Sequence, residues 1–159
     1  MNVDRSAVLV LRVFLVLLFG VLVVFQTLSL PGQFRHMAEE NPHDASLRWP
    51  ATIVAAFLVL CVQVVVVAIW KLLSMVQEDR IFSEASFTWV NAILGAIGAA
   101  WVVLGCIFVL VGFNADDPGP IMLLLLVLVG VTVVGLLMIV MRALLRQATT
   151  LRTDLDGVI

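Results

Sequence analysis

Charged side chains are scarce in this chain and absent from its four longest apolar runs. Only 13% of the 159 residues are charged, about half the fraction of an ordinary soluble domain, and the mean hydropathy is +1.18. The charge-free runs are Val13–Leu30, Pro50–Trp70, Phe87–Phe113 and Ile121–Met141. Because ion and proton pathways through a membrane use ionisable residues, their absence argues against a proton-coupled pump or a carboxylate-lined channel.

Catalytic and nucleic-acid-binding patterns are missing as well. The chain has no nucleophile elbow, no His-Glu-x-x-His, no P-loop and no Gly-x-Gly-x-x-Gly. Its nine Lys and Arg residues are scattered and form no basic patch. We therefore expect no enzymatic activity, no cofactor and no direct contact with nucleic acid.

What the chain does contain is four apolar runs of membrane-spanning length. At 1.5 Å rise per residue, about 20 helical residues cover the roughly 30 Å hydrocarbon layer of a bilayer. The sequence predicts an all-α integral membrane four-helix bundle, with residues 1–159 forming one transmembrane domain in the lipid bilayer. The first run exceeds the roughly 7–15 residues of a signal-peptide core, so we expect a retained span. The remaining segments are outer loops 31–49 and 114–120, an inner loop 71–86 and a cytoplasmic tail 142–159.

The distribution of basic residues predicts that both termini face the cytoplasm. In that orientation, only Arg35 and Arg48 lie on the outer side, which agrees with the positive-inside rule. Arg12 lies next to the first span, and its guanidinium can snorkel to the lipid headgroups. The basic residues expected on the inner side are Arg5, Arg12, Lys71, Arg80, Arg142, Arg146 and Arg152.

Two spans are expected to continue as helices into the cytoplasm. The second can extend through Lys71–Gln77, and the fourth carries an apolar stripe in its tail. The stripe consists of Leu144, Ala148, Leu151 and Leu155, spaced four, three and four residues apart. It can pack on Leu72 and Val76, lie on lipid headgroups, or dock a separate protein.

Small residues recur along one face of the third span. Asn91, Gly98, Gly105 and Gly112 are seven residues apart, and Gly95 lies between the first two. Because small residues let helix backbones approach closely in lipid, we expect this face at the centre of the bundle. The alternative is a homo-oligomer contact along the same face.

Gln63 is a polar residue deep in the second span. It lies roughly 10 Å from Trp70 along the helix, at a depth similar to Gly95 and Thr132. We expect its amide to bond to a carbonyl beside Gly95 or to Thr132, since an unsatisfied amide in hydrocarbon is costly. A small-molecule site at Gln63 is the functional alternative.

Neither the cysteines nor the histidines predict a covalent or metal site. Cys61 and Cys106 differ by about 12 Å in depth, whereas a disulfide needs Cα atoms within about 7 Å, so we expect two free, buried and unreactive thiols. His36 and His43 lie in an outer loop with three carboxylates, but their spacing matches no zinc pattern. We expect a solvated, part-helical loop; metal binding and a pH response are the alternatives.

The inner loop contains signals for the start of the third helix. Ser83 is a favourable N-cap residue, and Glu84 places negative charge in the first helical turn. Ile81 and Phe82 precede this cap and are expected to form an apolar plug against the bundle, as in a hydrophobic staple.

The segment Ile81-Phe82-Ser83 before an acidic residue, at the start of the third of four spans, resembles the bacterial domain-of-unknown-function 2975 family. The ending Ala148–Ile159, an Ala-x-x-Leu helix followed by acidic residues and a final apolar pair, is similar to that family too. The chain departs from the family at Asp79, where members tend to carry Gly. It also departs just after Ser83, where they tend to carry Asn and basic residues.

This resemblance implies a bacterial plasma membrane protein that acts on a cytoplasmic protein such as a small helix-turn-helix regulator. We therefore predict a non-enzymatic regulatory or interaction protein. The rival hypothesis is a small transporter, or an immunity or resistance protein, that handles an apolar molecule within the bundle. The residues expected to bind the cytoplasmic partner are Asp79, Arg80, Ile81, Phe82, Ser83, Leu151, Leu155 and Ile159.

Overall fold

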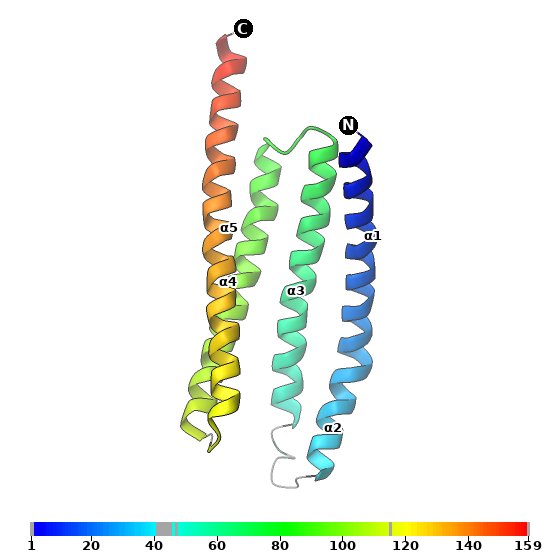
Figure 1. Cartoon of the computed structure of the whole chain (residues 1–159), viewed down its shortest axis with the longest axis vertical. Helices are drawn as coiled ribbons and strands as arrows, with labels where there is room; N and C mark the ends of the chain where they lie inside the picture. The colour runs from blue at the N-terminus through cyan, green and yellow to red at the C-terminus, as the bar shows by residue number, and fades with distance from the viewer. Residues whose placement is uncertain (1, 41–45, 47, 115, 159) are drawn as a thin grey trace. The chain divides into compact units, whose positions relative to one another are not determined.

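A computed structural model describes residues 2–40, 46, 48–114 and 116–158 of the chain (Figure 1). The all-α expectation is confirmed, because the regular structure of these residues is helical throughout and contains no strand. In chain order the elements are α1 (Asn2–Val24), the π-helix η1 (Phe25–Ser29), α2 (Leu30–Glu40), α3 (Arg48–Gln77), α4 (Glu84–Asn114) and α5 (Pro118–Val158).

Among the described residues, four helical stretches are long and apolar enough to cross a membrane. They cover Arg5–Gln33, Trp49–Gln77, Glu84–Asn114 and Pro118–Val158, and they contain the four apolar runs of the sequence. The helices also extend past those runs. Residues 31–40, expected in an outer loop, continue the first helical stretch, and α5 runs on to Val158.

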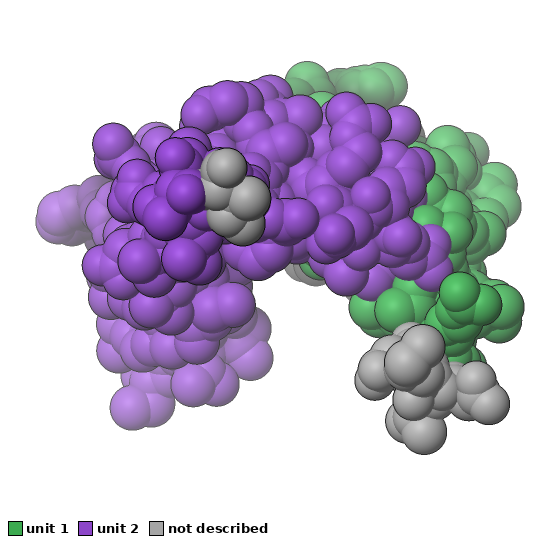
Figure 2. All heavy atoms as spheres, turned by 90° about the horizontal axis from the view of Figure 1, so that it is seen from above, with its two compact units in different colours: residues 1–70 green, residues 71–159 purple. Residues whose placement is uncertain are grey.

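The chain divides into two compact units, residues 1–70 and residues 71–159 (Figure 2). The first unit contains α1, η1, α2 and most of α3. The second contains the end of α3, the turn that follows it, α4 and α5.

A π-helical turn interrupts the first span just before a proline. Pro31 has no N–H for the carbonyl of Thr27, and the helix widens over η1, where the Leu30 N–H bonds to the Phe25 carbonyl. The Thr27 hydroxyl donates to the carbonyls of Val23 and Val24, at 2.9 and 3.4 Å. Back-bonding of this kind satisfies carbonyls that a distorted helix would otherwise expose to lipid.

Arg12 and Trp70 connect α1 to α3 within the first unit. The Arg12 guanidinium carbon lies 5.3 Å from the centroid of the Trp70 ring, the arrangement of a cation–π pair. An arginine next to a span thus contacts an aromatic face of the neighbouring helix, and its snorkelling to the headgroups stays a prediction.

In the second unit, α4 and α5 pack along most of their apolar length (Figure 1). The α5 positions with reduced exposure are three and four residues apart, the spacing of a left-handed helix pair. A hydrogen bond of 2.9 Å from the Trp101 indole to the Thr132 hydroxyl joins the two helices. The less exposed α5 residues in this row are Ile121, Leu124, Leu128, Val131, Gly135 and Met138.

At Gly135 the backbone of α5 lies close to a side chain of α4. A Cβ atom built at Gly135 would lie 3.2 Å from the Ile97 side chain of α4, a contact tighter than nine in ten real Cβ contacts. Packing over a small residue therefore occurs on α5, whereas the glycine spacing of the sequence predicts it on α4.

Candidate functional site

The turn after α3 closes with a Schellman motif that holds Asp79 in a left-handed conformation. The Arg80 N–H bonds to the Met75 carbonyl at 2.9 Å, and the Asp79 N–H bonds to the Val76 carbonyl at 3.2 Å. These are the two characteristic bonds of the motif, and Asp79 has the positive φ of 54° that the motif requires. Glycine adopts this conformation without strain, so Asp79 strains the backbone here.

Two serines fix the remainder of the turn. The Ser86 side chain is fully buried, and its hydroxyl donates to the carbonyls of Ile81 and Ser83. The Ser83 hydroxyl donates to the Arg80 carbonyl at 2.7 Å, and the Ser83 carbonyl accepts the Ser86 N–H at 3.1 Å. Ser83 does directly precede α4, as expected, but its hydroxyl bonds backwards into the turn instead of accepting a helix N–H.

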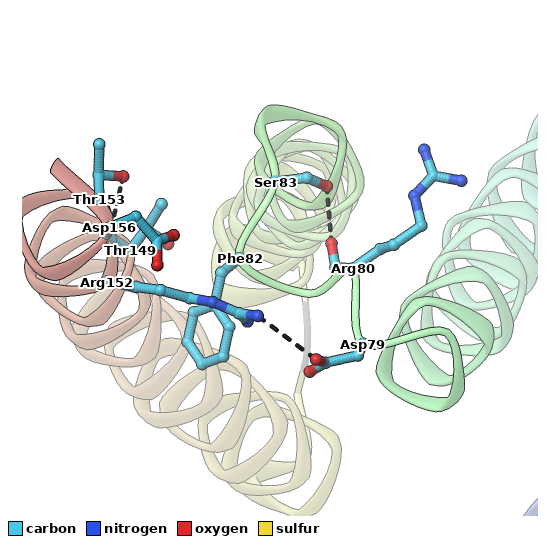
Figure 3. Close-up of a pocket in the computed structure, with 8 residues that line it drawn as sticks. All are labelled: Asp79, Arg80, Phe82, Ser83, Thr149, Arg152, Thr153 and Asp156. Atoms are coloured by element: carbon cyan, nitrogen blue, oxygen red, sulfur yellow. Dashed lines mark hydrogen bonds and ion pairs between the residues drawn. The ribbon is translucent and has the colours of Figure 1, made fainter. Parts of the chain in front are cut away.

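Arg152, in the C-terminal part of α5, contacts this turn twice. Its guanidinium lies 3.3 Å from a carboxylate oxygen of Asp79, and its central carbon lies 5.0 Å from the centroid of the Phe82 ring (Figure 3). Phe82 was expected to plug the bundle, but its ring lies beside Arg152 and stays partly exposed. Because the Asp79 side chain is 82% exposed, the ion pair itself contributes little stability.

Between the turn and α5 lies a cleft of ≈ 250 Å³, which we call the turn cleft. Asp79 and Arg152 reach across it, whereas the Arg80 guanidinium points away from Arg152, and Arg80 pairs with Glu78 at 3.6 Å (Figure 3). Two carboxylates, Arg152 and several hydroxyls offer hydrogen bonds of both kinds to a polar protein surface. The lining residues are Asp79, Arg80, Phe82, Ser83, Thr149, Arg152, Thr153 and Asp156.

The structure separates the partner-binding residues expected from the sequence. Asp79, Arg80, Phe82 and Ser83 line the turn cleft, whereas the half-buried Ile81 does not. Leu151 and Leu155 are 64% and 67% exposed and do not line it either. Ile159 lies outside the described residues.

The four α5 residues of the turn cleft were missed by the sequence analysis, although a signal for most of them exists. The α5 row that packs on α4 is spaced by three and four residues, and the same spacing continues through Leu145 to Thr149, Arg152 and Asp156. The face of α5 that packs on α4 therefore continues into the tail, where it lines the turn cleft. The stripe of Leu144, Leu151 and Leu155 lies on another face, and these three leucines are more than half exposed rather than packed on Leu72 and Val76.

Gln63 has a different hydrogen-bond partner from either one expected. Its Nε2 atom donates to Oε1 of Gln26 at 3.0 Å, and the Gln26 amide donates to the Ala56 carbonyl at 3.4 Å. Thr132 instead accepts the bond from Trp101. Since the Gln63 amide is engaged in helix packing, the hypothesis of a small-molecule site at this residue gains no support.

The glycine face of α4 is not the face that meets α5. A Cβ added at Gly95, Gly98, Gly105 or Gly112 would have no neighbour within 4 Å, and Asn91 is exposed. Packing of this face, in the bundle centre or against another copy, stays a prediction.

Cysteine and histidine form no composite site in the part of the chain that the structure describes. Cys61 and Cys106 are free, as expected, but Cys106 is exposed, whereas both thiols were expected to be buried. His36 is exposed on α2, and Arg35 pairs with Glu39 at 3.1 Å beside it. Among the described residues, no three His, Cys, Asp or Glu side chains lie close enough together to bind a metal ion. The other half of the outer-loop motif, His43 and Asp44, lies outside the described residues.

A family model described as "Protein of unknown function (DUF2975)" matches residues 32–159. The chain belongs to this family. The match contains α3, α4, α5 and the whole turn cleft, so the site is built from the part of the chain that the DUF2975 family shares. No curated protein and no solved structure matches the chain.

The strain at Asp79 predicts a stability difference between two substitutions in this DUF2975 protein. Asp79→Gly and Asp79→Ala both remove the carboxylate that contacts Arg152, but only glycine relaxes the left-handed backbone. We expect Asp79→Gly to be more stable than Asp79→Ala by about 1 kcal/mol. Thermal unfolding in detergent measures the difference, and equal stabilities would contradict a positive φ at this position.

Proposed function

We propose that the protein is a non-enzymatic regulatory component of a bacterial plasma membrane, which presents the turn cleft to a cytoplasmic protein. A small helix-turn-helix regulator is the kind of partner we propose. The spans act as a scaffold, and recognition takes place beyond their inner ends. This assignment rests on the orientation with both termini in the cytoplasm, which the basic residues favour.

What supports the proposal is the construction of the turn cleft, where hydrogen bonds fix the turn after α3 and Arg152 of α5 contacts it. α5 has 41 residues, about twice what a bilayer requires, so its C-terminal part stands outside the hydrocarbon layer. Arg152 joins that part to a turn already fixed by the Schellman motif and by Ser86. Rigid presentation of polar side chains favours recognition because little conformational entropy is lost on binding.

Affinity purification of the full-length tagged chain in mild detergent, followed by mass spectrometry, tests the proposal. Thr153→Arg places a long charged side chain in the turn cleft, and Thr150→Arg places the same side chain on the same helix outside it. We expect Thr153→Arg to lower recovery of the cytoplasmic partner about tenfold, equivalent to ~1.4 kcal/mol, and Thr150→Arg to leave it unchanged.

Deletion of Thr149–Ile159 is the complementary test, because it removes the α5 side of the turn cleft. We expect it to abolish partner recovery while membrane insertion persists. Full cellular function after this deletion, or equal recovery with both arginine variants, would contradict the proposal and favour the transport hypothesis.

A further inference from the structure

The C-terminal part of α5 has a second face, which the turn cleft does not use. It is a row of apolar residues spaced four and three residues apart, the a and d positions of a heptad repeat. Six of its members are 54–85% exposed, and Ala148 is half-buried. We call this row the α5 seam; it consists of Leu137, Met141, Leu144, Ala148, Leu151, Leu155 and Val158.

Lipid cannot cover the whole α5 seam. α5 is one helix to Val158, with no proline or glycine between Gly135 and Gly157 to bend it toward a membrane surface (Figure 1). Leu151 therefore lies roughly 15 Å beyond Met141 along the helix, and Val158 roughly 26 Å. Those distances carry both residues past the headgroups into water, where exposed leucines are unfavourable.

A soluble protein cannot cover the whole α5 seam either. The row starts at Leu137 and Met141, inside the apolar run that spans the bilayer, and continues into water without a break in its spacing. A partner that follows it across this boundary must itself have a membrane helix continuing into the same compartment. A second copy of this chain has such a helix, and insertion in the same orientation makes the two α5 helices parallel.

The composition of the α5 seam and its flanks suits a parallel pair. Leu137, Leu144 and Leu151 occupy d positions, and leucine is the residue found at d in two-stranded parallel coiled coils. In that register Arg152 at an e position faces Gln147 at a g position of the second copy, so no like charges oppose each other. The Arg152 contacts with Asp79 and Phe82 lie on the side of the turn cleft, and pairing along the α5 seam leaves that cleft free.

We propose that the α5 seam pairs with the α5 seam of a second copy as a parallel coiled coil that begins in the bilayer and extends into water. The resulting dimer presents two turn clefts on one side of the membrane. Its interface is distinct from the glycine face of α4.

Disulfide cross-linking of the full-length chain in native membranes tests the pairing. In a background carrying Cys61→Ala and Cys106→Ala, Leu151→Cys places a thiol on the α5 seam, and Thr150→Cys places one on the adjacent outer position. After mild oxidation we expect about tenfold more cross-linked dimer for Leu151→Cys than for Thr150→Cys, since only facing Cβ atoms reach disulfide distance. Leu155→Cys is a second seam variant, expected to match Leu151→Cys.

Three results would overturn the proposal: no cross-link at either seam position, equal cross-linking at Thr150, or a cross-linked product whose mass shows a different protein. Leu151→Lys gives an independent readout, because a charge at a d position is expected to convert the dimer to a monomer in detergent-free nanodiscs. Failure of this test leaves the recovery difference between Thr153→Arg and Thr150→Arg intact, so the two proposals are judged separately.

Discussion

Replacing Gly135 by leucine is expected to destabilise the α4–α5 pair by about 1–3 kcal/mol. Even a single Cβ atom at Gly135 would lie 3.2 Å from Ile97, and leucine adds three more carbons in the same space. The two helices must separate or tilt, which weakens the neighbouring bond between Trp101 and Thr132. Detergent unfolding followed by tryptophan fluorescence measures the loss, with Trp101 as one of the four tryptophans that contribute to the signal.

Gly20→Leu is the matched control for this experiment. Gly20 also lies within a spanning helix, so the gain in helix propensity is the same, but a Cβ atom there would have no neighbour within 4 Å. We expect Gly20→Leu to leave stability unchanged or slightly raised. If the two variants lost stability equally, close approach at Gly135 would not be the cause.

Replacing Gln63 by leucine is expected to cost about 1–2 kcal/mol, because it leaves the Oε1 atom of Gln26 without its donor in an apolar environment. Gln63 is 93% buried, and water cannot easily take its place. Titration with a denaturing detergent gives the free energy of unfolding for the variant and the parent chain.

The double variant Gln26→Leu with Gln63→Leu distinguishes the stability lost with the hydrogen bond from the stability lost through a change in side-chain size. With both amides gone, no polar group is left unsatisfied, and we expect the double variant to be more stable than Gln63→Leu alone. Additive losses from the two single substitutions would contradict coupling between the amides. A loss of transport of an apolar molecule with stability unchanged would revive Gln63 as a ligand site.

The membrane spans and the helix ends on either side of the turn after α3 could be predicted from the sequence, because each depends only on residues that are neighbours in the chain. The four apolar runs predicted the spanning helices, and the residues Lys71–Gln77 predicted the continuation of α3 that the structure contains. Ser83 predicted the start of α4 to the residue. The sequence also showed that Asp79 stands where the family tends to carry Gly. It did not show that Asp79 has a positive φ or that its carboxylate contacts Arg152.

Partners distant in the chain were predicted poorly. Depth alone offered Gln63 a carbonyl near Gly95 or Thr132, yet Gln26 is the residue that it meets. Glycine spacing on α4 did not indicate where α4 meets α5, because the glycine at which these two helices approach most closely is Gly135 of α5. In a chain that is apolar on all sides of its helices, sequence periodicity does not show which face meets a neighbour.

The sequence by itself determined that this is a four-span, all-α membrane protein, because hydropathy and length alone decide whether a helix can cross a bilayer. Only the tertiary structure decided that the turn after α3 meets the far end of α5. Arg152 is 73 residues from Asp79, and no local preference encodes a contact of that range. It also put Phe82 and Leu151 on different surfaces, since rotation about the α5 axis is fixed by packing on α4 and not by the residues of the tail.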